Sequence, residues 1–287
     1  MKYQWLNIYK DLYYNGKESS PRKLSIIELQ DYIFFADPYN RFANFEERKL
    51  NLKYIIGEFC WYLRGDLNDI EGIVFYSKFW KNLINTKKPW LNSNYGFYIK
   101  KQFIHCLNLL IEDKDSRQAS IIIANIKNNM QKTKDKICTY SINFRIRDNK
   151  LNMSVNMRSN DFILGTQIDY FQFSVFQEML LKKLQIHYNN LEMGYYSHKA
   201  DSLHIYEDKF HIMNKIVANN GKNFMNIDFP KIKDDKEVDF IFQKLPIIEK
   251  NIRNKRKFNK FSNEIEENKF DFTKECIKYL NNENTNN

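Results

Sequence analysis

The chain has 287 residues, of which 45 are lysine or arginine and 35 are aspartate or glutamate, so its formal net charge is +10 at pH 7. Apolar residues make up 43% and aromatic residues 16% of the sequence, which excludes a disordered, collagen-like or low-complexity chain. The positive charge favours anionic partners such as nucleotides, nucleic acid or an acidic membrane surface, without choosing among them.

The four cysteines, Cys60, Cys106, Cys138 and Cys276, lie far apart and form no CxxC pair. This spacing predicts neither a zinc site nor a disulfide framework, so no metal is expected. The N-terminus has no apolar signal region, and no segment approaches the roughly 20 apolar residues of a membrane span. We therefore expect a soluble, cytoplasmic protein without a membrane partner.

A helix is predicted over 49–63, KLNLKYIIGEFCWYL, because apolar residues recur there at helical spacing and would form one buried face. Glu58 lies on or near that face. A carboxylate among apolar neighbours must be solvated, paired or shifted in its pKa. Two interpretations of Glu58 therefore stay open: an ordinary residue at the rim of the core, or a working acid.

Residues 119–126, ASIIIANI, form a β-branched run that predicts a buried strand. Apolar and polar residues then alternate over 139–147 and again over 150–158. The Asp148-Asn149 pair between these stretches is typical of a tight turn, so the two stretches predict a hairpin.

A largely apolar helix is predicted over 169–185 and a short strand over 203–206. With the hairpin before them, these elements predict a mixed α+β sheet domain. The basic run 249–260 is expected to be a solvated helix face and only secondarily a contact for polyanions. The terminal NNENTNN, 281–287, is polar enough to be disordered.

Cys138 stands at the start of a predicted strand, shortly after two lysines. Nearby cations give a thiol thiolate character below its free pKa of about 8.5, although a single strand cysteine is more often a buried apolar filler. After the hairpin the chain returns to RSND at 158–161. A guanidinium, a hydroxyl and a carboxylate at one strand end suit a phosphate and a neighbouring polar ring.

Several segments together resemble, in order and spacing, the thymidylate synthase superfamily. They are GEFCWYLRGD at 57–66, DSRQASIII at 115–123, the strand with Cys138, MRSNDFILGTQID at 157–169 and DSLHIYE at 201–207. None is decisive alone, whereas five in the right order form a strong signal. The resemblance covers a core at about 20–210 and implies one domain, 1–287, with a mixed sheet packed by helices that dimerises through the sheet. The domain is completed by a basic helical extension at about 212–280 and a polar tail.

The resemblance implies that Cys138 adds to C6 of a pyrimidine nucleotide. This addition makes C5 nucleophilic toward the one-carbon unit of 5,10-methylenetetrahydrofolate, the implied co-substrate. Glu58 would then order water around the base and assist the proton transfers that follow.

Phosphate binding is implied for Arg158 and Ser159, with Arg22 joining from the N-terminal segment. Arg117 matches an arginine that reaches across a twofold axis into the neighbouring active site, and Gln118 stands where the family has a second arginine. The resemblance therefore implies a homodimer with shared sites.

The sugar hydroxyl would be held by His204 and Tyr206. Asp161 looks like the carboxylate that binds the pterin ring, and Trp80 and Tyr95 lie where the family lines the folate and nucleotide pocket.

Asp169 departs from the family pattern, because typical thymidylate synthases have Asn there to read uracil. A carboxyl group can accept from N4 of cytosine and share a proton with N3, which resembles the deoxycytidylate hydroxymethylase branch. The chain also ends in polar residues in place of a short apolar tail that closes over the folate. Without that lid, water could add to the intermediate and give a hydroxymethyl product.

The expected function is folate-dependent C5 hydroxymethylation of a cytidine monophosphate, with the deoxy form preferred. A divergent thymidylate synthase that methylates deoxyuridylate is the alternative. A third hypothesis is a catalytically silent paralogue whose basic surface binds nucleic acid or a protein, but a scaffold has no need of Cys138, Glu58 and Asp161 together. Nucleic acid is therefore not the expected partner.

Overall fold

The computed structural model describes residues 2–42, 44–84 and 89–282. Within them, a mixed sheet of seven strands runs in the order β1-β2-β8-β6-β5-β4, and β7 pairs with β8 beside this path. The strands are β1 (Lys17–Ser19), β2 (Ile26–Ala36), β4 (Ser120–Ile122), β5 (Thr139–Arg147), β6 (Lys150–Met157), β7 (Asn160–Asp161) and β8 (Glu192–Tyr206). A separate ribbon pairs β3 (Asn44–Phe45) with β9 (Phe224–Met225).

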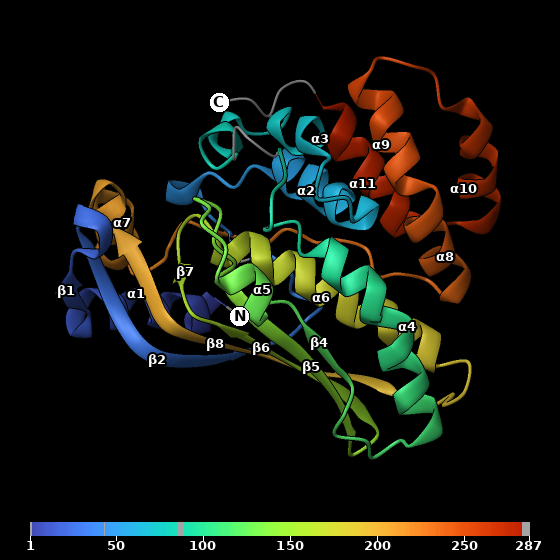
Figure 1. The fold of residues 1–287 in the computed structure, drawn as a ribbon, viewed down its shortest axis with the longest axis horizontal. Helices are drawn as coiled ribbons and strands as arrows, with labels where there is room; N and C mark the ends of the chain where they lie inside the picture. Colours follow the sequence, from blue (N-terminus) through green and yellow to red (C-terminus); the bar gives the residue numbers. More distant parts are fainter. Residues whose placement is uncertain (1, 43, 85–88, 283–287) are drawn as a thin grey trace.

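The helices form two layers above the sheet (Figure 1). They are α1 (Lys2–Asn15), α2 (Leu52–Arg64), α3 (Ile70–Val74), α4 (Gly96–Glu112), α5 (Ile126–Asn129), α6 (Thr166–Leu184), α7 (Phe210–Ala218), α8 (Asp235–Gln243), α9 (Leu245–Arg253), α10 (Ser262–Asn268) and α11 (Asp271–Asn281). The long helices α4 and α6 lie on the sheet, and α9 and α11 pack against α2 above them. The expected α+β class, a mixed sheet packed with helices, is confirmed.

Local sequence explains where α2 begins and ends. The side chain of Asn51 accepts a hydrogen bond from the backbone N–H of Tyr54 and so caps the first turn. Gly65 follows the helix with a φ of 60°, a left-handed conformation that favours glycine. The helix predicted over 49–63 is confirmed, and Glu58 is among its buried residues.

The predicted hairpin is also confirmed. Arg147 pairs with Lys150 around a two-residue turn in which Asp148 and Asn149 both have positive φ. Such a turn matches the twist of the flanking strands, and Asp and Asn tolerate it better than most residues. The resulting register directs alternate apolar side chains of β5, such as Phe144, into the core.

Two strand predictions had the wrong length. The run 119–126 contains only the short edge strand β4, because the side chain of Asn125 caps α5 and the chain turns there. The strand predicted over 203–206 is only the end of β8, which is much longer because it pairs with β2 on one side and β6 on the other. The helix predicted over 169–185 is confirmed as α6, which begins at Thr166.

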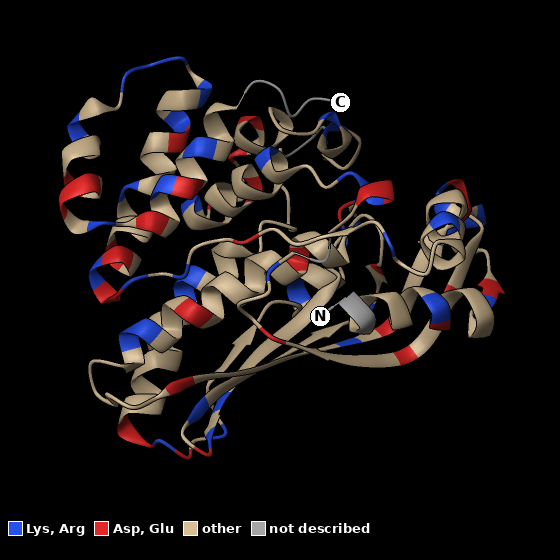
Figure 2. Cartoon of the chain, turned by 180° about the vertical axis from the view of Figure 1, so that it is seen from behind, with Lys and Arg blue, Asp and Glu red and all other residues tan. Residues whose placement is uncertain are grey.

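The basic run 249–260 is helical only in part, which corrects the prediction. α9 ends at Arg253, and the chain then turns through Lys255, whose φ is 54°. Glu249 is fully buried and pairs with Arg253, so this face of the helix is not solvated. The exposed cations after α9 form the blue segment at the upper left of Figure 2. The predicted tail 281–287 lies outside the described residues except for its first two.

One face of the sheet is open in the described part of the chain, since the helices gather on the other (Figure 1). The open face carries exposed side chains of Ile33 and Phe35 on β2 and Tyr195 on β8. The rings of Phe35 and Tyr195 lie 5.4 Å apart. An exposed apolar patch of this kind is typical of a protein–protein contact.

The charged side chains are distributed over the helices and loops (Figure 2). Among the described residues, none of the helices is both long and apolar enough to cross a bilayer.

Candidate active site

Cys138 lies just before β5, where α4 and the end of β6 meet. Its backbone N–H donates to the hydroxyl of Tyr95, which stands at the start of α4, at 3.1 Å. Arg158 follows β6, and its Nε and Nη2 donate to the carbonyls of Ile137 at 2.8 Å and Lys136 at 3.2 Å. The same Nη2 lies 3.4 Å from Sγ of Cys138. Burial raises the pKa of the thiol, and the guanidinium opposes this rise.

Glu58 is buried on α2, with a different donor on each carboxyl oxygen. The hydroxyl of Tyr54, one turn earlier, donates to Oε1 at 2.9 Å, and Nε2 of Gln172 on α6 donates to Oε2 at 3.3 Å. Burial, together with the charge of Asp169, raises the pKa of Glu58 to about 8. The glutamate is therefore an internal group poised to exchange a proton near neutral pH, and it is not a solvated rim residue.

Asp169 stands in the first turn of α6 and is half-buried. Its Oδ2 accepts a hydrogen bond of 2.8 Å from Nδ2 of Asn160, whose own Oδ1 accepts from the hydroxyl of Thr166. Burial raises the pKa of Asp169 to about 7. Its charge also raises the pKa values of Glu58 and Cys138, so these three groups form one electrostatic cluster.

A second polar group lies where β7 pairs with the end of β8. Asp161 and His204 are partners in this ladder. Oδ1 of Asp161 accepts from the backbone N–H groups of Ile163 at 2.8 Å and Leu164 at 2.9 Å, whereas Oδ2 is buried without a partner among the described residues. The ring of His204, which is buried, lies edge-on to Tyr206 at 5.1 Å.

The structure brings most of the remaining predicted residues near this cluster. Arg22 is exposed on a 3-10 turn after β1, and its charge lowers the pKa of Cys138, so it lies on the same side of the molecule. Ser159, half-buried, joins Arg158 to β7. Trp80 is buried and donates its indole N–H to the hydroxyl of Tyr54 at 3.1 Å. Tyr54 in turn bonds to Glu58, so Trp80 is linked to the glutamate through this tyrosine.

Arg117 and Gln118 are not brought to the cluster within this chain. Both are exposed in the turn before the edge strand β4. In the part of the chain that the structure describes, neither side chain bonds to Cys138 or to its neighbours. The role of Arg117 in the active site of a second copy, which the family resemblance implies, stays a prediction.

Sequence reasoning missed several residues that the fold places around the carboxyls: Tyr54, Gln172, Asn160, Thr166 and Arg48. Tyr54 could have been found, because residues four apart share one face of a helix. Asn160 stands inside the RSND segment that the sequence singled out, whereas the approach of Gln172 to Glu58 depends on how α6 packs on α2.

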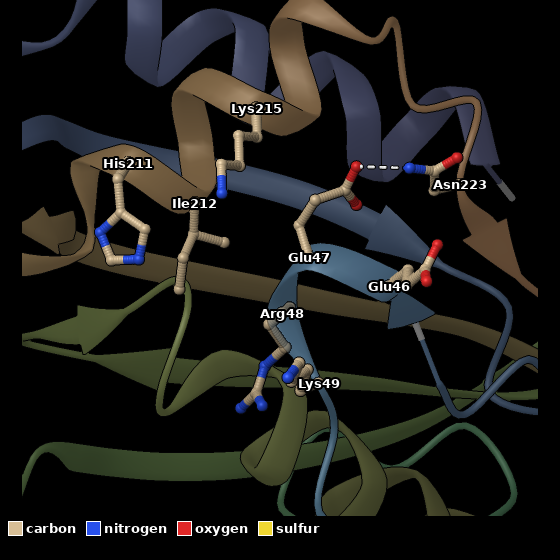
Figure 3. A pocket seen from close by; sticks show the side chains of 8 residues that line it. All are labelled: Glu46, Glu47, Arg48, Lys49, His211, Ile212, Lys215 and Asn223. Carbon is tan, nitrogen blue, oxygen red and sulfur yellow. Dashed lines mark hydrogen bonds between the residues drawn. The ribbon is translucent and has the colours of Figure 1, made fainter.

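A surface pocket of about 480 Å³ lies between the segment after β3 and helix α7 (Figure 3). Its lining residues are Glu46, Glu47, Arg48, Lys49, His211, Ile212, Lys215 and Asn223. Arg48 connects this pocket to the site, because its Nε donates to the carbonyl of Ile163 at 2.8 Å, close to Asp161. Glu47 accepts a 2.9 Å bond from Asn223 on the far wall.

Within the described residues, no three His, Cys, Asp or Glu side chains are grouped to hold a metal ion. Cys60, Cys106 and Cys276 are buried and free, so Cys138 is the least buried of the four thiols. A thiol beside a guanidinium, with two ionisable carboxyls close by, indicates an enzyme that combines a nucleophile with acid–base groups.

Comparison with known proteins identifies the class. The thymidylate synthase family model matches residues 3–259, so the chain belongs to the thymidylate synthase family. It is a one-carbon transferase, and its reaction class is folate-dependent transfer to C5 of a pyrimidine nucleotide. The family resemblance predicted from the sequence is confirmed.

Individual relatives include phage hydroxymethyltransferases. The chain is similar to the deoxycytidylate 5-hydroxymethyltransferase of Enterobacteria phage T4, with 32% identity over 181 residues, 57% of this chain and 71% of the relative. It is 27% identical over 257 residues to the deoxyuridylate hydroxymethyltransferase of Bacillus phage SP01, which covers 82% of this chain and 65% of the relative. The thymidylate synthase of Mycoplasma genitalium is 24% identical over 244 residues, 71% of this chain and 81% of the relative.

Proposed function

We propose that this chain hydroxymethylates C5 of a cytidine monophosphate, with deoxycytidylate as the preferred substrate and 5,10-methylenetetrahydrofolate as co-substrate. The observation that carries the proposal is Asp169, an acid in the same electrostatic cluster as Cys138 and Glu58. Among the relatives, the T4 protein is named for deoxycytidylate and the SP01 protein for deoxyuridylate, so the relatives alone do not choose the base.

The chemistry of the carboxyl group favours cytosine. Asn160 occupies Oδ2 of Asp169 as a donor, which leaves Oδ1 for a substrate. A carboxyl whose pKa is about 7 is available in both protonation states, so it can accept from N4 of cytosine and share a proton with N3. Uracil presents O4 and N3–H at these positions, and a mismatched buried polar edge reduces kcat/KM by up to about 10⁴-fold.

Cys138 is the proposed nucleophile. Its thiolate forms a bond to C6, and the electron pair of the C5–C6 double bond moves toward C5 and the N3 side, where Asp169 supplies a proton. C5 then bonds to the one-carbon unit, its proton leaves to water ordered by Glu58, and the folate amine leaves with a proton. Water adds to the resulting methylene group and loses one proton to the water ordered by Glu58. N3 then returns its proton to Asp169 as expulsion of the Cys138 thiolate restores the C5–C6 double bond. No hydride moves, so tetrahydrofolate is released.

The nucleotide phosphate is proposed to bind Arg158, Ser159 and Arg22. The hydrogen bonds of Arg158 use Nε and Nη2, which leaves Nη1 for a phosphate oxygen. His204 and Tyr206 are proposed to hold the sugar hydroxyl.

The pterin ring of the folate is proposed to bind beside Asp161. The buried Oδ2 of Asp161 has no partner among the described residues. An amino-pterin ring offers the N–H donors that such an oxygen requires. Trp80 and Tyr95 are proposed to line the folate and nucleotide pocket as aromatic walls; both are buried.

We further propose that 1–287 acts as one domain and that two copies associate through the open face of the sheet. The packing of α11 and α9 on α2 supports the single domain. The exposed Ile33 and Phe35 support the dimer. In it, Arg117 and Gln118 of each copy are proposed to reach the site of the other.

One incubation tests the proposed reaction. The purified protein is given 5,10-methylenetetrahydrofolate with deoxycytidylate, cytidylate or deoxyuridylate, while product mass and dihydrofolate absorbance are followed. Hydroxymethyl deoxycytidylate without dihydrofolate is the expected result. A methylated product from deoxyuridylate with dihydrofolate would instead establish the thymidylate synthase alternative. The Cys138→Ala variant is the control, because it lacks the nucleophile.

A further inference from the structure

A chain of hydrogen bonds leads from the edge of the cluster to Glu58. The indole N–H of Trp80 lies 3.1 Å from the hydroxyl oxygen of Tyr54, and that oxygen lies 2.9 Å from Oε1 of Glu58. Trp80 is buried and packs on Trp61 of α2 with a ring separation of 5.3 Å. Trp80 is therefore held by α2, the helix that carries Tyr54 and Glu58.

The direction of the hydrogen bonds follows from donor chemistry. An indole N–H can only donate, so the oxygen of Tyr54 must accept from Trp80. A tyrosine hydroxyl has one proton, and the neighbouring acceptor is Oε1 of Glu58. Tyr54 is thus committed as a donor to the glutamate, and it lies one helical turn before it on the same face.

The rest of the environment opposes ionisation of Glu58. The side chain is buried, and Asp169 faces it from α6 with a charge of the same sign. Gln172, also on α6, donates to Oε2 at the longer distance of 3.3 Å and shares its amide with the carbonyl of Ile55 at 3.0 Å. Tyr62 of α2 is a further titratable group near the glutamate, and its own pKa is raised by burial and by the charge of Glu58.

We propose that Tyr54, oriented by Trp80, is the positioning residue that keeps Glu58 ionisable and thereby sets the pH at which the proton leaves C5 of the pyrimidine. The proposal rests on the proposed function, since it assigns Glu58 a part in that proton transfer. Tyr54 itself touches no reacting atom. It acts through its 2.9 Å hydrogen bond to the glutamate, which becomes charge-assisted when the carboxyl group is ionised.

The first test measures ionisation without turnover. The carboxyl carbons of glutamate are labelled with ¹³C, the Glu58 signal is assigned with a Glu58→Gln variant, and its chemical shift is followed against pH. In Tyr54→Phe, the midpoint of the Glu58 titration is expected to move upward by roughly one pH unit, because the lost donor favoured the charged form. Trp80→Phe is expected to move it in the same direction by a smaller amount.

The second test measures the reaction. Release of tritium from [5-³H]deoxycytidylate with 5,10-methylenetetrahydrofolate is followed from about pH 6 to 9.5, a range that spans the ionisation of Glu58. Tyr54→Phe is expected to lose about tenfold at pH 7 and to regain most of the rate at high pH. Alkylation of Cys138 measured over the same range separates the thiol ionisation from that of Glu58.

Tyr32→Phe is the matched control, because the Tyr32 hydroxyl donates to Asp11 at 2.7 Å in a similar tyrosine–carboxylate bond on β2. It should leave both titrations unchanged. An unmoved Glu58 signal in Tyr54→Phe overturns the inference, as does a moved signal with an unmoved rate profile. If the parent enzyme releases no tritium and forms no product, the proposed function fails, while the NMR titration still decides the role of Tyr54 at Glu58.

Discussion

Nη2 of Arg158 lies 3.4 Å from Sγ of Cys138, and the backbone N–H of Arg158 donates to the carbonyl of Cys138 at 2.8 Å. The cation and the thiol are therefore fixed to each other by main-chain as well as side-chain contacts. Because burial raises the pKa of the thiol, the guanidinium is the group that most strongly restores its reactivity.

Arg158→Gln should raise the pKa of Cys138, because the closest compensating charge is lost while burial persists. We expect the rate of iodoacetamide alkylation of Cys138 at pH 8 to fall about tenfold, the effect of roughly one pKa unit. Peptide mapping by mass spectrometry reports this rate. Arg147→Gln, which removes an exposed guanidinium paired with Asp115, is the control and should not change it. Equal rates in parent and Arg158→Gln would contradict the proposed activation.

Asp169→Asn should shift base preference toward uracil. An amide offers one fixed donor and one fixed acceptor, whereas the carboxyl group accepts from N4 of cytosine and shares a proton with N3. The ratio of kcat/KM for deoxycytidylate to that for deoxyuridylate is expected to fall by at least tenfold and by up to about 10⁴-fold. Steady-state kinetics with both nucleotides measure the ratio, and an unchanged ratio would remove Asp169 from base selection.

Ionisation of Glu58 should destabilise the fold as pH rises. Its pKa is raised from 4.5 to about 8, mainly by burial, so between these values the folded state binds a proton that the unfolded state has released. The free energy of unfolding should decline across this pH window by at most about 5 kcal/mol, the value that corresponds to a pKa shift of this size. Urea titrations at a series of pH values should show the decline in the parent and a smaller one in Glu58→Gln. Parallel curves for the two proteins would contradict the prediction.

His198 should produce the opposite dependence in acid. It is buried on β8, stacks on Phe34 at 4.9 Å and bonds through Nδ1 to the hydroxyl of Tyr196 at 2.7 Å. Burial lowers the pKa of His198 from 6.5 to about 3, so the unfolded state binds the proton first and stability is lost as pH falls below 6.5. When the pH is lowered from about 7 to 5, where an unshifted histidine titrates, the Tm of His198→Phe should fall less than the Tm of the parent. A larger loss in the variant would refute this.

Arg41 and Glu178 form a fully buried ion pair. The arginine also lies over the ring of Phe272 at 5.0 Å, and Oε1 of the glutamate accepts from the backbone N–H of Ile232 at 2.9 Å, so the pair ties the C-terminal segment to α6. Arg41→Met should lower the free energy of unfolding by about 3–5 kcal/mol, because it leaves an unpaired buried charge. The double variant Arg41→Met/Glu178→Leu should recover a large part of this loss in chemical denaturation. A double variant no more stable than the single one would show that packing dominates over charge.

Features encoded by neighbouring residues could be predicted from the amino-acid sequence alone. The helix around Glu58 follows from apolar spacing, with Asn51 before it and Gly65 after it, and the hairpin turn follows from Asp148-Asn149. The lengths of β4 and β8 could not be predicted in this way, because a strand ends where its partner strands stop offering hydrogen bonds.

The candidate site also has features that the sequence predicts and features that depend on tertiary packing. Residue type and motif order were enough to single out Cys138, Glu58 and Asp169, since each is a chemically unusual residue in its segment. Their ionisation states depend on contacts between distant segments, such as Gln172 reaching Glu58 from another helix. Burial and neighbouring charge set a pKa, and both are properties of the packed chain that spacing along the sequence does not encode.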